Sequence, residues 1–178
     1  MQTITSKNTA LTQIAATFKK FNFNNSYVLD WGCGKGLSKK FCEKTFNNCK
    51  VELFDPFNGY ESGVQEFCLF ALSGMCECKF DRKIITCNNV LNVLEDHTLE
   101  EVLTGVFCAA NLCKVNRIIF KIYEGNKSGA GKITKTDCYQ RNEKTGQYLD
   151  KISGMIAKFG GNWTIRKTGQ YIICDITH

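Results

Sequence analysis

The sequence predicts an α/β domain built on a mostly parallel, twisted sheet, with helices on both faces and an antiparallel hairpin at the C-terminus. Two observations support this prediction. Short apolar runs with strand character alternate along the chain with segments whose apolar residues recur at helical spacing. Two strand-like runs then follow each other across a turn at Thr168–Gly169. At 178 residues we expect one domain, residues 1–178, around a single core.

The individual elements follow from the spacing of apolar residues. We expect strands in "SYVLDW", "CKVELFD", "RKIITCNNVLNV" and "RIIFKIY", and a final pair within "WTIRKTGQYIICDI". We expect helices over residues 11–21, 36–46, 98–110 and 148–159. In the second helix, Leu37, Phe41 and Thr45 should face inward. The third should begin at a capping box of Thr98 and Glu101, and Gly160 should end the fourth.

The most informative stretch is "YVLDWGCGKGLSKKF", in which Gly32, Gly34 and Gly36 follow a short apolar strand that contains Asp30. Glycine costs backbone entropy on folding, so this spacing indicates a turn that a ligand approaches closely. In a parallel sheet such a turn lies at the carboxyl edge, where ligands bind. Asp55 ends the next strand, where a carboxylate can accept two hydrogen bonds from a ribose diol. The sequence therefore predicts a site for a nucleotide-like ligand.

Two common phosphate-binding patterns do not fit. A dinucleotide fingerprint needs a glycine where this chain has Leu37. The segment "GNKSGAGKIT" has one residue too many for a P-loop, and Ile133 stands where a hydroxyl should hold magnesium. We interpret that segment as a mobile loop.

The pattern D-x-G-x-G-x-G in "VLDWGCGKG" resembles the cofactor loop of class I S-adenosylmethionine (SAM)-dependent methyltransferases. Asp55 and "ITCNNVLNVLED" also fall where that family has its ribose acid and fourth-strand loop. The resemblance implies the Rossmann-like class I methyltransferase fold, SAM as cofactor and methyl transfer as the reaction. More narrowly, "LDWGCGKG", "FDPFN", "NNVLNVLED" and "YQRNEKTGQYL" are similar to small methyltransferase-like proteins of bacteriophages and DNA phosphorothioation gene clusters. That narrower resemblance implies a phage or bacterial source and the bacterial cytosol as the compartment.

The resemblance also implies roles for individual residues. Asp30 would face the methionine ammonium, directly or through water, and Asp55 would hold the ribose hydroxyls. Phe57 would lie beside the adenine, and Asn88 would border the methyl group. The glycine loop would let the cofactor approach the backbone through Gly32, Cys33, Gly34 and Gly36.

The chain departs from the family pattern in two ways. The stretch from Glu61 to Asp81 shows no clear strand, so we expect the third strand of the fold to be short or absent. No DPPY-like tetrad follows the fourth strand, and Cys87 has no adjacent proline, as C5-methylating enzymes would require. The first departure implies that adenine is recognised through backbone and apolar contact, and the second weakens the case for ordinary methylation of DNA bases.

Polar residues after the fourth strand and in a later polar stretch are the candidates for contact with a methyl acceptor. Amide and hydroxyl groups can orient an amine or hydroxyl by donating and accepting hydrogen bonds at once. For the asparagines, a turn residue that bonds its own backbone is an equally good interpretation. The candidates are Asn88, Asn89, Asn92, Tyr139 and Gln140.

Charge and composition bear on partners. The net charge is +6, and the segment 125–151 interleaves basic residues with Tyr139 and Tyr148, which suits either a nucleic-acid surface or a solvated loop over a small acceptor. No apolar run is long enough for a membrane span. The eleven cysteines include no CxxC pair, so we expect free thiols and no metal site. The oligomeric state is left open.

Three functions stay open on the sequence. The first is an active SAM-dependent methyltransferase. The second is a non-catalytic protein that binds SAM or a nucleotide and acts by sequestration or by blocking a host defence enzyme. The third is chemistry on SAM itself, such as cleavage. Binding of SAM and of its demethylated product separates the first from the second.

Overall fold

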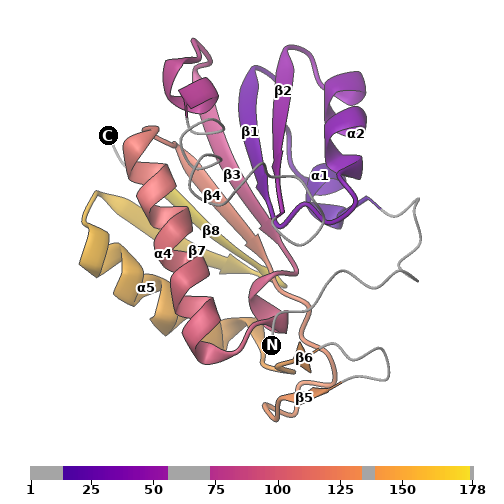
Figure 1. The fold of residues 1–178 in the computed structure, drawn as a ribbon, viewed down its shortest axis with the longest axis vertical. Coiled ribbons are helices and arrows are strands. Elements are labelled where there is room, and N and C mark those ends of the chain that lie inside the picture. Colours follow the sequence, from indigo (N-terminus) through magenta and orange to yellow (C-terminus); the bar gives the residue numbers. More distant parts are fainter. Residues whose placement is uncertain (1–13, 56–72, 134–138, 177–178) are drawn as a thin grey trace.

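The computed structural model describes residues 14–55, 73–133 and 139–176. Six strands form one sheet in the order β2-β1-β3-β4-β8-β7 (Figure 1). The strands are β1 (Ser26–Trp31), β2 (Cys49–Phe54), β3 (Arg82–Asn88), β4 (Arg117–Lys121), β7 (Trp163–Thr168) and β8 (Tyr171–Ile176).

The first four of these strands run parallel, and the last two are antiparallel. β1 pairs in parallel with both β2 and β3, and β3 pairs in parallel with β4. β8 runs antiparallel to β4, and β7 returns beside β8 through a turn in which Gly169 has φ 59°. This confirms the predicted mostly parallel sheet with a C-terminal antiparallel hairpin. Because β1 to β4 run in one direction, their carboxyl ends meet at one edge of the sheet.

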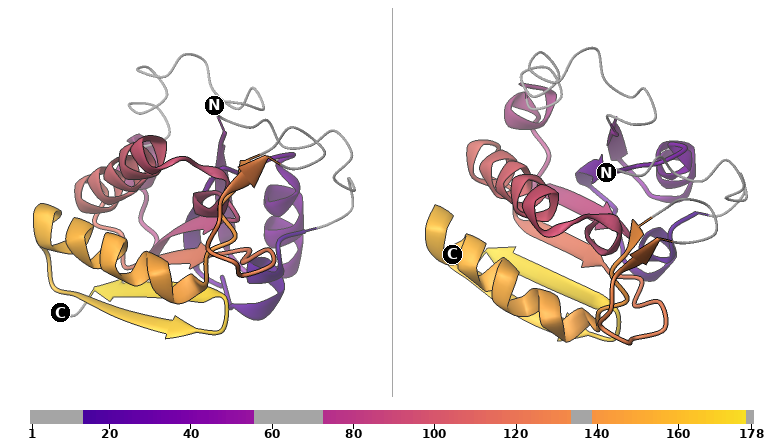
Figure 2. Two further views of the ribbon diagram at one scale, coloured as in Figure 1. Left: turned by 90° about the horizontal axis from the view of Figure 1, so that it is seen from below. Right: turned by 60° about the horizontal axis from the view of Figure 1, so that its bottom comes forward.

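Helices cover both faces of the sheet, as the sequence predicts (Figures 1 and 2). One apolar cluster joins α1 (Ala16–Lys20) and α2 (Leu37–Thr45) to one face of the strands. A second cluster joins α4 (Asp96–Leu112) and α5 (Tyr148–Phe159) to the other face. Alternate strand residues supply the two clusters, since side chains along a strand point to opposite faces. The first cluster takes Val28, Ile84 and Ile119, and the second takes Leu29, Ile85, Ile118 and Phe120.

Two helix predictions were wrong in detail. The buried residues of α2 are Ser38 and Cys42, whereas Thr45 is exposed and both Leu37 and Phe41 are only half-buried. Ser38 faces the sheet because its hydroxyl donates a hydrogen bond to the buried carboxyl of Asp30.

The start of α4 also differs from the prediction. The helix begins at Asp96, two residues before the capping box predicted at Thr98. The amide of Leu99 already donates to the carbonyl of Glu95 at 2.8 Å, and Arg141 and Lys151 hold the carboxylate of Asp96. The predicted end of α5 is confirmed, because Gly160 with φ 70° is its C-cap.

The predicted weakness of the third strand concerns residues that are mostly outside the described part of the chain. Residues 56–72 are not described, and a short helical segment occupies 73–77. Among the described strands, β2 and β7 form the two edges of the sheet, and β2 is the edge beside β1. In the described part of the chain, no helix is long and apolar enough to cross a membrane.

A small lobe lies at the carboxyl end of the sheet (Figure 2). It contains the two-stranded sheet of β5 (Lys132–Ile133) and β6 (Tyr139–Gln140), with the 3-10 turns η1 (Leu91–Val93) and η2 (Thr145–Gln147). Glu124 anchors this lobe: its Oε1 accepts hydrogen bonds from the amide and the hydroxyl of Thr145, each at 2.8 Å. Its Oε2 pairs with Lys127 at 3.2 Å. Glu124 thereby links the end of β4 to the start of α5.

The anchor predicts a specific loss of stability in acid. The hydrogen bonds from Thr145 lower the pKa of Glu124 to about 2 from its usual 4.5. A depressed carboxyl pKa stabilises the fold fully above the unfolded pKa, and this contribution disappears as the pH falls through the folded pKa. We therefore expect the stability advantage of the wild type over Glu124→Gln to be largest above about pH 5 and to shrink between pH 4.5 and 2.

Urea unfolding at a series of pH values measures this difference. Glu77→Gln, at an exposed glutamate on the helical segment 73–77, is the matched control and should track the wild type at every pH. A pH-independent difference between wild type and Glu124→Gln would contradict the assignment.

Candidate functional site

The backbone conformation of the loop between β1 and α2 explains why the loop contains three glycines. Gly32, Gly34 and Gly36 have φ values of 73°, 58° and 67°, in the left-handed region that disfavours residues with a Cβ. The amides of Gly32 and Cys33 both donate to the carbonyl of Phe54, at 2.7 and 3.1 Å. A Cβ on Gly32 would lie 2.3 Å from Cγ2 of Val90, so this glycine also permits close packing. The loop is therefore a fixed turn that ties β1 to β2.

Asp55 lies directly against this loop. The residue is buried, and its Oδ2 accepts a hydrogen bond of 2.8 Å from the amide of Gly34. The structure thus brings together the two features that the sequence assigned to one site, the glycine loop and the acid after β2. A carboxylate at this position can accept hydrogen bonds from a diol beside the loop.

Asp30 is more deeply buried, with 3% of its surface exposed. Its carboxyl oxygens accept hydrogen bonds from Ser38 Oγ at 2.5 Å, Thr86 Oγ1 at 2.8 Å and Asn88 Nδ2 at 3.1 Å. Burial raises the pKa of Asp30, and the three donors oppose that rise. In this arrangement the carboxyl joins β1, α2 and β3, and its place facing a ligand ammonium, directly or through water, stays a prediction.

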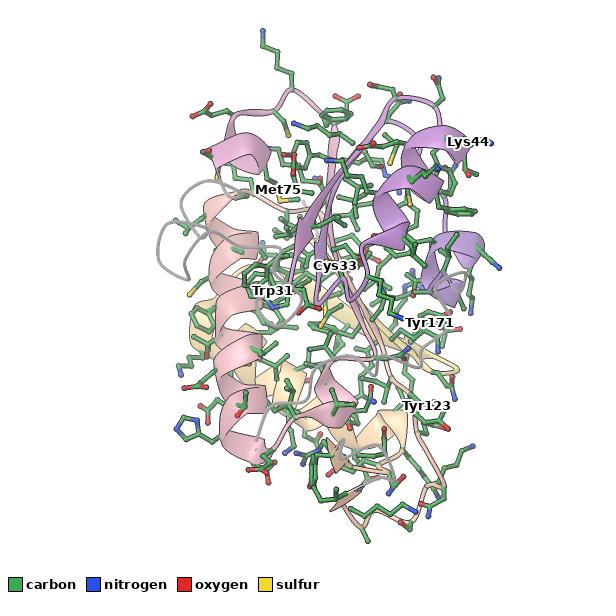
Figure 3. All side chains as sticks on the ribbon, turned by 45° about the vertical axis from the view of Figure 1, so that its right-hand side comes forward. Trp31, Cys33, Lys44, Met75, Tyr123 and Tyr171 are labelled. Atoms are coloured by element: carbon green, nitrogen blue, oxygen red, sulfur yellow. The ribbon has the colours of Figure 1, made fainter. Side chains whose placement is uncertain are left out.

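Cys33 contributes its backbone to the turn, because its carbonyl accepts a hydrogen bond from Gly36. Burial raises the pKa of its thiol well above the usual range, and the carboxylates of Asp30 and Asp55 raise it further. The thiol therefore stays protonated, and it is a poor nucleophile. Figure 3 shows Cys33 in the loop between β1 and α2. Phe57, the predicted neighbour of adenine, lies outside the described residues.

Asn88 and Asn89 end β3 at the same edge. The amide of Asn88 donates to Asp30, and its Oδ1 accepts from the hydroxyl of Thr17 on α1. Asn89 is exposed and has φ 57°, a conformation that asparagine tolerates better than most residues. Of these two predicted residues, Asn89 has its side chain open to solvent, whereas Asn88 braces the buried acid.

Asn92 and Gln140 meet each other inside the lobe. Asn92 Nδ2 donates to Gln140 Oε1 at 3.2 Å, and both side chains are buried. Asn92 Oδ1 accepts from the amide of Tyr123, while Gln140 Nε2 donates to the Tyr123 carbonyl. The structure therefore brings these two predicted residues together as a clamp on the Tyr123 backbone. Tyr139 is half-buried beside Gly131.

Tyr123 itself was missed by the sequence analysis. It follows β4 at the carboxyl edge, and 54% of its surface is exposed. In Figure 3, Tyr123 lies below Cys33, on the side of the molecule that carries the lobe. Its position directly after the apolar run "RIIFKI", at the carboxyl end of a predicted parallel strand, was the available signal.

Much of the charge of the basic segment 125–151 is neutralised within the protein. Arg141 is buried and pairs with Asp96 and Glu143, at 2.8 and 2.9 Å. Lys151 also pairs with Asp96, and Lys127 pairs with Glu124. Lys132 and Lys144 are exposed, and Lys135 is not described. Over the residues that the structure describes, no cluster of three or more candidate ligands could hold a metal ion.

Comparisons with known proteins identify the fold. No protein-family model matches the sequence, and no curated protein sequence matches it. The structure is similar to human N-acetylserotonin methyltransferase in complex with SAM, with a TM-score of 0.52, 14% identity, and coverage of 90% of this chain and 50% of that one. The chain thus spans about half the length of the human enzyme.

Two bacterial structures give lower scores. Magnesium protoporphyrin IX methyltransferase from Synechocystis PCC 6803 with bound SAM has a TM-score of 0.47 at 15% identity, over 88% of this chain and 72% of that chain. An O-methyltransferase family protein from Burkholderia thailandensis has a TM-score of 0.46 at 13% identity, over 88% of this chain and 51% of that one. The chain has the Rossmann-like fold of class I SAM-dependent methyltransferases, with an antiparallel hairpin at the end of a mostly parallel sheet.

The close packing of the glycine loop predicts a measurable stability difference between two glycines. Gly169→Ala places a Cβ at φ 59° with no atom within 4 Å, so it should cost about 1–2 kcal/mol of unfolding free energy. Gly32→Ala has the same conformational cost plus a clash with Val90, so it should cost more. Urea unfolding of the two variants tests this directly.

A double variant isolates the clash. Replacing Val90 by Ala in the Gly32→Ala background removes Cγ2, so the double variant should be more stable than the sum of the two single effects predicts. Equal costs for Gly32→Ala and Gly169→Ala would show that the loop does not pack on Val90.

Proposed function

We propose that the protein is a SAM-dependent methyltransferase that transfers a methyl group to a small acceptor. The observation that supports this most strongly is the contact between Asp55 and the amide of Gly34, at the carboxyl edge of a class I methyltransferase fold. It places a carboxylate beside a turn with glycine at three of its five positions. That combination suits a ribose diol and a ligand that must approach the backbone closely.

In this proposal the glycine loop and Asp55 hold the cofactor in different ways. Gly32, Cys33, Gly34 and Gly36 give it backbone to lie against, and Asp55 accepts hydrogen bonds from the ribose hydroxyls. Asp30 acts indirectly: it fixes the start of α2 through Ser38 and the end of β3 through Asn88. It is a positioning residue, and the geometry of the loop depends on it.

The chemistry asks little of the protein beyond alignment. SAM supplies an activated methyl group on a sulfonium, so a well-oriented acceptor can gain roughly 7–11 kcal/mol from positioning alone. Asn89 and Tyr123 are the exposed side chains at the ends of β3 and β4, and we assign them to the acceptor. Asn92 and Gln140 would support Tyr123 from behind through its backbone. Tyr139 stays a candidate at the side of the lobe.

A small acceptor is favoured over nucleic acid by the ion pairs of the segment 125–151. Arg141, Lys127 and Lys151 each have an acidic partner within the fold, so they are poorly available for phosphates. A non-catalytic SAM-binding protein would share the same cofactor site and differ in lacking an acceptor. The narrower resemblance to phage and phosphorothioation-associated proteins stays a prediction.

Removal of the Asp55 carboxylate should weaken cofactor binding. We expect Asp55→Ala to reduce SAM affinity by about 1.5–3 kcal/mol, the scale for losing hydrogen bonds to a charged group. Isothermal titration calorimetry with SAM and with S-adenosylhomocysteine measures this, with circular dichroism to show that the variant is folded. Asp150→Ala, at an exposed acid on α5, is the control and should bind as the wild type does. Unchanged affinity in folded Asp55→Ala, or no binding of either ligand to the wild type, would refute the proposal.

A second experiment tests the acceptor class. If the acceptor is small, fluorescent single-stranded DNA and RNA should show no measurable binding even at low salt. Binding that weakens steeply with salt would contradict this. In that case, Lys132→Ala/Lys144→Ala should flatten the log–log slope by up to about two times 0.7, because each phosphate contact with a single strand releases counterions.

A further inference from the structure

Two cysteines meet at the edge of the sheet opposite to the candidate site. Cys76 lies on the helical segment 73–77, and Cys113 is the C-cap of α4. Their sulfur atoms are 2.7 Å apart, although the residues are 37 positions apart in sequence. This separation is closer than a normal thiol hydrogen bond and approaches the length of a disulfide, about 2.0 Å.

The fold holds these two thiols in place from both sides. Met75, the neighbour of Cys76, is fully buried in the core cluster that contains α4 (Figure 3). The ammonium of Lys83 at the start of β3 donates to the carbonyl of Cys76 at 3.1 Å. Cys113 is 1% exposed, whereas Cys76 is exposed. One thiol of the pair is therefore open to reagents in solution, and the other is buried directly behind it.

We propose that Cys76 and Cys113 are a redox site that forms a reversible intramolecular disulfide when the protein meets hydrogen peroxide. The Cys76 thiolate attacks one peroxide oxygen, the O–O bond breaks, and hydroxide leaves and takes up a proton to give water. Cys113 then attacks the sulfenic sulfur of Cys76. The S–S bond forms as the S–O bond breaks, and the leaving hydroxide takes the thiol proton of Cys113 as a second water. Two thiols lose two electrons and the peroxide gains them.

The environment of Cys113 supports this order of events. Burial raises the pKa of Cys113 to about 12, with the neighbouring Cys76 adding to the rise and Lys83 opposing it. Cys113 therefore stays a thiol until an electrophilic sulfur is placed beside it, and the exposed Cys76 reacts first. Cys78 is nearby, but its thiol donates to the carbonyl of Met75 at 3.1 Å.

Mass spectrometry of the whole protein tests the site. Reduced protein is treated with one equivalent of hydrogen peroxide, the remaining thiols are alkylated, and peptides are mapped without reduction. We expect a monomer whose mass has fallen by two hydrogen atoms, with a cross-linked peptide pair that contains Cys76 and Cys113 and separates on addition of dithiothreitol. Cys76→Ser should lose the cross-link completely.

Two control variants make the result specific. Cys108→Ser removes another exposed thiol on α4, and Cys78→Ser removes the neighbouring thiol of the cluster; both should keep the Cys76–Cys113 cross-link. Four outcomes would overturn the proposal: no oxidation, a sulfinic acid on Cys76 without a cross-link, a disulfide to Cys78, or a disulfide between two molecules. Cys76 is exposed, so Cys76→Ser should fold and the comparison stays valid.

Discussion

The buried carboxyl group of Asp30 is the interaction on which the arrangement of the site depends. It receives hydrogen bonds from α2, from the middle of β3 and from the end of β3, through Ser38, Thr86 and Asn88. Burial of an acid is costly unless its oxygens have donors, so these bonds must form together for the strands and α2 to pack. The glycine loop lies in the sequence between Asp30 and its partner Ser38. Its shape, and with it the position of the Gly34 amide that bonds Asp55, follows from that network.

The two ends of the sheet differ in chemistry. At the carboxyl end, acids, amides and glycines surround the loop, and the lobe is tied on by Glu124 and by the Asn92–Gln140 pair. At the other end, the thiols of Cys76 and Cys113 are in contact at the C-terminus of α4. Since parallel strands place all their carboxyl ends at one edge, the proposed cofactor site at that edge and the proposed redox pair at the opposite edge share no residues.

Local patterns predicted the backbone of the site, and packing decided its side chains. The glycine spacing and the strand-ending Asp55 were readable because each reports on its own strand or turn. The hydrogen bonds to Asp30 could not be predicted, because their donors belong to residues 38, 86 and 88, two of which are distant in sequence. The same reason explains why the hydrogen bond between Asn92 and Gln140, separated by 48 positions, was not predicted; their assignment to an acceptor stays a prediction. The face of α2 was predicted only in part: Phe41 packs against the first apolar cluster, but Ser38, whose partner is the buried Asp30, takes a buried position.

We propose that SAM binds along the glycine loop beside Asp55. The most direct measurement is a titration of isotopically labelled protein with SAM, followed by amide chemical shifts in two-dimensional NMR. Binding at this place should cause large shifts for the amides of Gly32, Cys33, Gly34 and Asp55. The reason is that the ribose would compete for the carboxylate that the Gly34 amide now contacts. Amides at the opposite edge, such as those of Cys113 and Val115, should not move. A titration in which the loop amides stay unchanged while others shift, or in which none shift, would contradict it.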